Sequence, residues 1–443
     1  MEPVIVIGAG LAGSEAAWQL ARRGIPVELR EMKPRKMTPA HHSPDFAELV
    51  CSNSLRSDQL ENAVGLLKEE LRRCGSLIMA CADEHRVEAG GALAVDRYAF
   101  SAAITQKIRN HPNITVVEGE VTEIPAEGNV IIASGPLTSE ALSAEIAKLF
   151  PDSKYLNFFD AAAPLVTFES IDMDSAWFAS RYDRGTPDYV NCPMTEEEYQ
   201  AFWEALTTAQ EAEVHGFEDA GVFEGCMPVE VMARRGRDTL CYGPLKPVGL
   251  KDPKTGKEPF AVVQLRRDNA QGSIYNLVGF QTHLKWPEQK RVFSMIPALK
   301  NAEYVRYGVM HRNSFVDAPR ALDATFAIPG TRCRLAGQIT GTEGYVEAIA
   351  SGLLAALNTY AELSGASPAS IPATSALGSL VRYATSPSTL DYQPMHVNFG
   401  LFPPLEDAPR RKAERRAALA ERARSDLAAY VRSRRDLFGG EGA

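Results

Sequence analysis

The sequence predicts an α/β fold: a Rossmann-like domain whose two parts lie at the ends of the chain, with an α+β domain inserted between them. Residues 4–31 read as a buried strand, a glycine-rich turn, a helix and a second strand. Two later segments, 130–135 and 334–356, again place a glycine-containing turn directly after an apolar strand. Because these two segments lie far apart along the chain, the residues between them are expected to form the insertion.

The composition agrees with a soluble globular protein. At 443 residues, with 45% apolar and 23% charged residues, the chain is long enough for about two to four domains. These values exclude a disordered chain, a collagen-like chain and a small disulfide scaffold. The net charge of −9 argues against a protein that coats nucleic acid with its whole surface. Residues 409–436, however, contain ten Lys or Arg and four Asp or Glu, a local charge of +6.

The first element of the Rossmann-like domain carries a dinucleotide-binding pattern. Val4–Ile7 is an apolar, β-branched run, as a strand buried on both faces requires. In the turn that follows, Gly8 allows a tight bend, Gly10 lets a pyrophosphate approach the backbone, and Gly13 lets the helix pack on the strand. Glu31 ends the second strand, where it can accept a hydrogen bond from a ribose hydroxyl. The complete turn is Gly8, Ala9, Gly10, Leu11, Ala12 and Gly13.

The two later segments indicate which dinucleotide is bound. They resemble the second and third signatures of two-dinucleotide-fold flavoproteins, which implies FAD, with contacts from Ser134, Gly135, Gly337 and Gln338. Gln338 stands where most such proteins have Asp, a departure that resembles flavoproteins modifying tRNA uridines. Only one complete GxGxxG is present, so NADPH or NADH is expected to bind transiently as a reductant rather than to be held tightly.

The predicted domain organisation follows from these positions. Residues 1–162 form the first part of the FAD-binding domain, 163–326 the inserted substrate and RNA domain, and 327–443 the second part with a basic C-terminal helix. Within the insertion, Thr195 and Glu198 predict a capping box that starts a helix over 196–212. Strands are expected over 240–242, 260–265 and 274–280, and the basic helix has an apolar stripe at Leu419, Ala423, Leu427 and Val431.

No segment reads as a signal peptide or a spanning helix, so we expect no membrane association. The seven cysteines form no CxxC pair, which indicates reduced thiols in a cytoplasm, and the histidines show no metal-ligand spacing, so no metal site is expected. Two cysteines have unusual surroundings. Cys51 lies in LVCSNSLRS and Cys226 in VFEGCMPVEVMARRGRD, next to polar or cationic residues that favour a thiolate. From the residues alone, either is a catalytic thiol or a buried loop cysteine.

Six segments together resemble the bacterial folate- and FAD-dependent tRNA (uracil-5-)-methyltransferases, over nearly the whole chain: GAGLAGSEAA, LVCSNSLRS, AVDRYAF, FEGCMPVE, YGPLKPVGL and AGQITGTEGYVEAIASG. A larger flavoprotein that modifies wobble uridine shares the AGQ loop but has a longer C-terminal region. The resemblance implies methylation of C5 of a T-loop uridine. It also implies 5,10-methylenetetrahydrofolate as the carbon donor and FADH2, regenerated by NAD(P)H, as the source of electrons.

The resemblance carries the two family cysteines onto Cys51 and Cys226. We assign Cys226 as the thiolate that adds to uracil, because the neighbouring arginines could hold enolate and phosphate charge, and Cys51 to the flavin. The opposite assignment stays open. The family stacks folate between flavin and a histidine, and His283 is the candidate; otherwise it is a solvated or capping histidine.

Two arginine clusters are candidates for contact with tRNA. Arg234, Arg235 and Arg237 follow Cys226, and Arg410 and Arg411 begin the basic terminal segment. The alternative for that terminus is a solvated charged helix. Three rival functions remain at this point: a flavin-dependent small-molecule oxidoreductase, a tRNA wobble-uridine modification enzyme, and a non-catalytic tRNA-binding flavoprotein.

Overall fold

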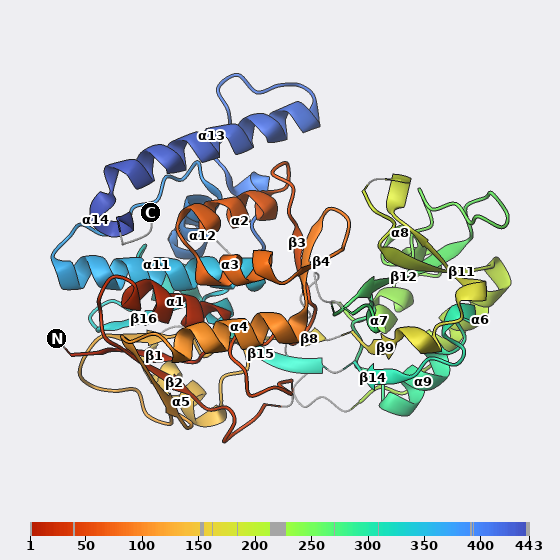
Figure 1. The fold of residues 1–443 in the computed structure, drawn as a ribbon, viewed down its shortest axis with the longest axis horizontal. Coiled ribbons are helices and arrows are strands. Elements are labelled where there is room, and N and C mark those ends of the chain that lie inside the picture. Colours follow the sequence, from red (N-terminus) through yellow and green to blue (C-terminus); the bar gives the residue numbers. More distant parts are fainter. Residues whose placement is uncertain are drawn as a thin grey trace.

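The computed structural model has two lobes, seen side by side in Figure 1. One contains both chain termini and a parallel sheet, and the other contains an antiparallel sheet. The residues described are 2–38, 40–150, 155–161, 163–183, 185–212, 227–269, 271–308, 310–389, 392 and 394–439. Cys226 therefore lies outside the described residues.

The first lobe is built on a five-stranded parallel sheet in the order β16-β7-β1-β2-β6. Its central strand is flanked on both sides, which explains why its sequence is almost entirely apolar. The sheet draws strands from both ends of the chain, so the α/β prediction is confirmed. The strands are β1 (Val4–Ile7), β2 (Val27–Glu31), β6 (Ile114–Glu118), β7 (Val130–Ile132) and β16 (Cys333–Leu335).

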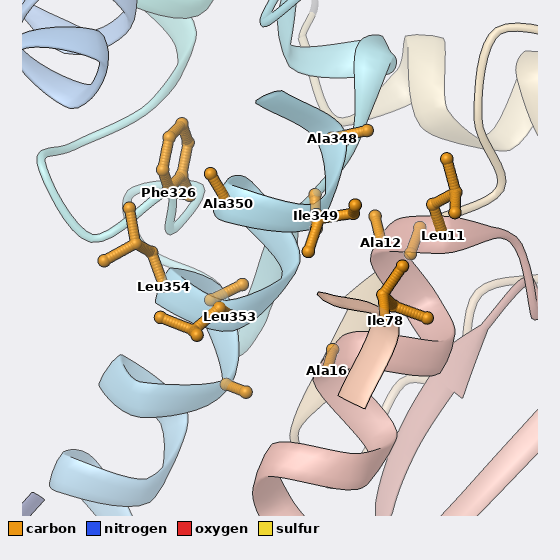
Figure 2. Close-up of a cluster of buried hydrophobic side chains, with 14 of the residues drawn as sticks. Leu11, Ala12, Ala16, Ile78, Phe326, Ala348, Ile349, Ala350, Leu353 and Leu354 are labelled. Carbon is orange, nitrogen blue, oxygen red and sulfur yellow. The ribbon is translucent and has the colours of Figure 1, made fainter. Parts of the chain in front are cut away.

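Two helices that are far apart in sequence pack against each other beside this sheet. They are α1 (Leu11–Ala21) and α11 (Tyr345–Ser364). Figure 2 shows Leu11, Ala12 and Ala16 of α1 facing Ala348, Ile349 and Leu353 of α11. The contact is close because Gly352 has no side chain: a Cβ there would lie 2.2 Å from the carbonyl oxygen of Ala12. Small residues thus bring the two nucleotide-facing segments of the chain together.

The remaining helices of the first lobe cover this core. The apolar pattern around Cys74 and Cys81 forms two helices, because the chain turns at Gly75, which has a φ of +71°. The basic terminal helix lies over the lobe (Figure 1), with Leu419, Ala423 and Leu427 buried as the apolar stripe predicts. These helices are α2 (Ala63–Arg73), α3 (Leu77–Glu84), α4 (Arg97–Arg109), α5 (Glu140–Lys148), α10 (Ala318–Ala321), α12 (Ala376–Thr385), α13 (Lys412–Ser433) and α14 (Arg435–Phe438). A small sheet of β3 (Ser54–Ser57), β4 (Arg86–Val87) and β5 (Ala92–Val95) adjoins them.

The second lobe is a six-stranded antiparallel sheet with helices. The strands, in sheet order, are β10 (Trp177–Ala179), β11 (Tyr189–Met194), β12 (Ala261–Arg267), β13 (Ile274–Leu277), β9 (Leu165–Thr167) and β14 (Tyr304–Arg306). Its helices are α6 (Glu196–Thr207), α7 (Val229–Arg234), α8 (Thr239–Tyr242) and α9 (Trp286–Phe293). An antiparallel pair, β8 (Tyr155–Ala161) with β15 (Met310–Val316), lies between the two sheets in Figure 1.

The strands predicted over 260–265 and 274–280 are present as β12 and β13, although β13 ends at Leu277, and two other local predictions in this lobe are corrected. The Thr195–Glu198 capping box is present at the start of α6, but the helix ends at Thr207 rather than at residue 212. Residues 240–242, predicted as a strand, belong to the short helix α8, because a run this short does not distinguish the two periodicities. The domain boundaries after residues 162 and 326 stay predictions.

Candidate functional site

A cavity of about 1070 Å³, its open mouth included, lies where the glycine-rich turn leaves β1. A crevice at the carboxyl ends of parallel strands is the usual ligand site of open α/β sheets. The structure brings residues from all three predicted signatures into its lining, although they are distributed over more than 300 residues of sequence. The predicted residues that line it are Gly8, Ala9, Gly10, Leu11, Ala12, Glu31, Ser134, Gly135, Gly337 and Gln338.

The three glycines of the turn differ in what a side chain would meet. A Cβ on Gly13 would lie 1.8 Å from the carbonyl oxygen of Gly8, so this glycine serves the packing of α1 on β1. Gly8 has a φ of +98° and would bring a Cβ to 2.6 Å from Ala133. A Cβ on Gly10 would meet no protein atom within 4 Å. Gly10 leaves space on the cavity side, at the N-terminus of α1, as close approach of a pyrophosphate requires. The residues therefore fit a dinucleotide.

Glu31 is buried at the edge of this cavity and holds the turn in shape. Its Oε2 accepts a hydrogen bond from the backbone N–H of Ala9 at 2.7 Å, and its Oε1 accepts from that of Lys33 at 2.9 Å. Each carboxylate oxygen can accept more than one bond, so these contacts leave capacity for a ribose hydroxyl. The ribose contact itself stays a prediction.

The second and third signatures supply two further turns. Ser134 and Thr138 share a hydrogen bond of 2.7 Å beside Gly135, whose φ is +74°. In the third signature, Ser351 accepts from the backbone N–H of Gly337 at 2.7 Å, and Gln338 donates from Nε2 to Glu343 at 2.7 Å. The amide of Gln338 is thus fixed at the cavity wall by a carboxylate from its own loop.

The loop that carries Cys51 is held against this cavity. Residues 48–50 of this loop are irregular, and Val50 lines the cavity. The hydroxyl of Tyr345, which also lines the cavity, accepts from the backbone N–H of Cys51 at 2.8 Å and of Ser52 at 3.2 Å. Burial raises the pKa of Tyr345, so the phenol stays neutral and keeps its own proton to donate. Tyr345 lies within the third segment, 334–356, but was not among the functional residues predicted from the sequence.

Two buried arginines hold the same loop from other elements. Arg97, at the start of α4, donates to the carbonyl oxygen of Leu49, and Arg266, on β12 of the second lobe, donates to Ser52 Oγ at 2.6 Å. Arg97 also pairs with Asp268 of the second lobe at 2.9 Å, with both side chains at most 4% exposed. Burial works to lower the pKa of Arg97, but the charge of Asp268 and its hydrogen bonds with Arg97 act together against it, and the net shift is upward. The Cys51 loop therefore sits in a cationic environment where the two lobes meet.

The predicted RNA-contacting arginines are exposed in both clusters. In the second lobe, Arg234 forms an ion pair with Glu211, Arg237 forms one with Glu196 at 3.0 Å, and Arg235 is exposed at the end of α7. In the first lobe, Arg410 and Arg411 are exposed just before α13, and the neighbouring cations Lys412 and Arg415 are exposed as well. Cations at a helix N-terminus oppose the helix dipole, so an anionic partner would be favourable there. Their contact with RNA stays a prediction.

His283 does not line the dinucleotide cavity; it lies buried in the second lobe between two carboxylates. Its Nε2 is 2.6 Å from Glu211 and its Nδ1 is 2.7 Å from Glu230. Burial works to lower the pKa of His283, but Glu230 and then Glu211 outweigh it and raise the pKa. These contacts account for the buried histidine without a ligand, and its role toward folate stays a prediction.

In the part of the chain that the structure describes, no group of three His, Cys, Asp or Glu side chains is placed to hold a metal ion. Within the same residues, no helix is both long enough and apolar enough to cross a membrane.

Comparison with known proteins identifies the family. The family model "Glucose inhibited division protein A" matches residues 3–367. The fold resembles crystal structures of Aquifex aeolicus GidA, with a TM-score of 0.68 at 15% identity, covering 97% of this chain and 75% of that chain. Two curated relatives are named methylenetetrahydrofolate–tRNA-(uracil-5-)-methyltransferase TrmFO. That of Desulforudis audaxviator is 59% identical, covering 97% of this chain and 98% of its own, and that of Listeria monocytogenes is 60% identical, covering 95% and 96%. The chain therefore belongs to the TrmFO family of methylenetetrahydrofolate–tRNA-(uracil-5-)-methyltransferases.

Proposed function

We propose that this protein methylates C5 of a T-loop uridine in tRNA. The carbon comes from 5,10-methylenetetrahydrofolate, and the electrons come from FADH2 that NADPH or NADH regenerates in the cytoplasm. The observation that carries the proposal is the position of the Cys51 loop, which Tyr345 ties to the wall of the dinucleotide cavity. A candidate thiolate, a dinucleotide site and cationic side chains thus meet at one place between the lobes.

The dinucleotide cavity would hold FAD through its three signatures. The N-terminus of α1 and the space left by Gly10 receive the pyrophosphate, and Glu31 receives a ribose hydroxyl. Bound FADH2 would supply the hydride that reduces the transferred methylene group to methyl.

A cysteine thiolate is needed because C5 of uracil is a poor nucleophile. When the thiolate adds to C6, the ring becomes an enolate whose C5 can attack the one-carbon unit. Loss of the C5 proton would then expel tetrahydrofolate and leave an exocyclic methylene on C5. Addition of the hydride would convert that methylene to methyl, expel the thiolate from C6 and restore the ring. We assign this thiolate to Cys226. Cys51 lies at the FAD side, where Arg97 and Arg266 hold its loop and provide the positive charge that favours a thiolate.

Two experiments test the function and the assignment. Labelled methylenetetrahydrofolate, NAD(P)H and unmodified tRNA should yield label in 5-methyluridine, and absence of label would refute the function. RNA containing 5-fluorouridine traps the covalent enzyme–uracil adduct, because fluorine blocks loss of the C5 proton. We expect the Cys51→Ala enzyme to form this adduct and the Cys226→Ala enzyme not to form it. An adduct in Cys226→Ala alone would reverse the two roles.

A further inference from the structure

Next to the Cys51 loop lies a second cleft, of about 770 Å³ with its mouth included. We call it the Arg306 cleft. It lies where the lobes meet, since Arg306 and Val305 come from β14 of the second lobe, and Arg97 and Tyr98 from the start of α4 in the first. Glu48 lines both this cleft and the dinucleotide cavity, so the two are separated by one loop.

Arg306 is unusual among the cations of this region. Its Nε and Nη2 atoms are buried from solvent and have no hydrogen-bond partner among the residues that the structure describes. Two buried guanidinium nitrogens without an acceptor are unfavourable, because their N–H groups have lost water and gained no hydrogen bond in return. Burial, together with repulsion from Arg97, lowers the pKa of Arg306 by more than the charge of Asp268 raises it.

The nearby carboxylates are already used by other groups. Asp268 accepts from Arg97 at 2.9 and 3.1 Å. Glu48 accepts from the backbone N–H of His42 at 2.8 Å and pairs with Lys33 at 3.4 Å. The other polar residues that line the cleft with Arg306 carry no carboxylate. They are His42, Ser43, Arg97, Tyr98 and Ser101.

From this geometry we propose, on the basis of the proposed function, that the Arg306 cleft is an oxyanion subsite of the active site. Nε and Nη2 of Arg306 would bind two oxygens of one substrate group, the fork geometry that guanidinium offers to carboxylate and phosphate. The folate carries such a group in its glutamyl carboxylates, and the tRNA carries one in a phosphate near the target uridine.

The test uses the full-length holoenzyme and three variants. Arg306→Met removes the charge and keeps an apolar side chain of similar length, and Arg306→Lys restores the charge without the fork. Arg332→Met removes an exposed arginine of the first lobe as a matched control. Because Arg306 has no partner to lose, Arg306→Met is expected to retain FAD and to melt no lower than the wild type.

Binding of three ligands is then measured at constant ionic strength: inorganic phosphate, followed by thermal shift, 5-formyltetrahydrofolate and tRNA. A tetrahydropterin without the glutamyl tail serves as the control for the folate. Arg306→Met should lose the stabilisation by phosphate and bind one substrate about 10-fold more weakly, equal to about 1.4 kcal/mol. A loss for the tailed folate alone assigns the site to the carboxylate, and a loss for tRNA assigns it to phosphate. Arg306→Lys should recover part of the loss.

The proposal is overturned if Arg306→Met matches the Arg332→Met control with all three ligands. Phosphate separates this result from failure of the proposed function. If the wild-type protein binds neither folate nor tRNA but Arg306→Met still abolishes the phosphate effect, the oxyanion site stands and the assigned activity does not.

Discussion

The variant Gly10→Ala is expected to weaken FAD binding at the dinucleotide turn while leaving the stability of the fold almost unchanged. The backbone of Gly10 is extended (φ −70°, ψ −168°), so alanine can adopt it, and the added Cβ meets no protein atom within 4 Å. Without ligand, replacing the N-cap glycine by alanine lowers the free energy of unfolding by a few tenths of a kcal/mol to ~1 kcal/mol. Alanine also restricts the unfolded chain, which raises the free energy of unfolding by ~0.4–1 kcal/mol. The free energy of unfolding of the FAD-free protein should therefore change by less than about 0.5 kcal/mol.

With FAD bound, the same Cβ would occupy the space that we propose for the pyrophosphate. Loss of one hydrogen bond to a charged group costs about 1.5–3 kcal/mol, which corresponds to roughly 10- to 150-fold weaker binding. The assay is titration of FAD-free protein with FAD, followed by flavin fluorescence, together with urea unfolding of the same preparation.

Gly13→Ala is the contrasting variant. Its Cβ would lie 1.8 Å from the carbonyl oxygen of Gly8, so overpacking should lower stability by about 1–3 kcal/mol or more even without FAD. The reasoning is refuted if Gly10→Ala binds FAD as the wild type does, or if it destabilises the FAD-free protein as much as Gly13→Ala.

Three further predictions concern the contacts around the site. Arg97→Met leaves Asp268 buried without its partner and should lower the free energy of unfolding by about 3–5 kcal/mol in urea titrations, with part of the loss recovered in Arg97→Met/Asp268→Leu. Because the pKa of His283 is raised in the folded state, its ion pairs stabilise the fold below the unfolded-state pKa, and this stabilisation is lost as pH rises through the folded-state pKa. His283→Gln should therefore lower the free energy of unfolding more at pH 6 than at pH 9. An equal loss at both pH values would contradict the role of these ion pairs. Neutralising Arg410 and Arg411 with glutamine should weaken tRNA binding and flatten its salt dependence while FAD content stays constant, and unchanged affinity would mean that the helix start is merely solvated.

Local patterns account for the parts of the fold that were predicted well. The strand and turn of residues 4–13, the capping box at Thr195 and the apolar stripe of the terminal helix each depend on neighbours within a few residues. The errors occur where the local signal is short. Residues 240–242 offered three positions to distinguish a strand from a helix, and α6 ended before its apolar pattern did.

By itself, the sequence determined the glycine spacing of the dinucleotide turn and the polar or cationic residues that neighbour Cys51 and Cys226 along the chain, because both are properties of a short stretch of chain. Tertiary structure alone decided what the Cys51 loop touches. Tyr345, 294 residues away, and Arg266, from the other lobe, hold that loop, and Arg306 is left without a partner beside it. Such contacts depend on how two sheets are placed relative to each other, and no periodicity or spacing within either sheet specifies that placement.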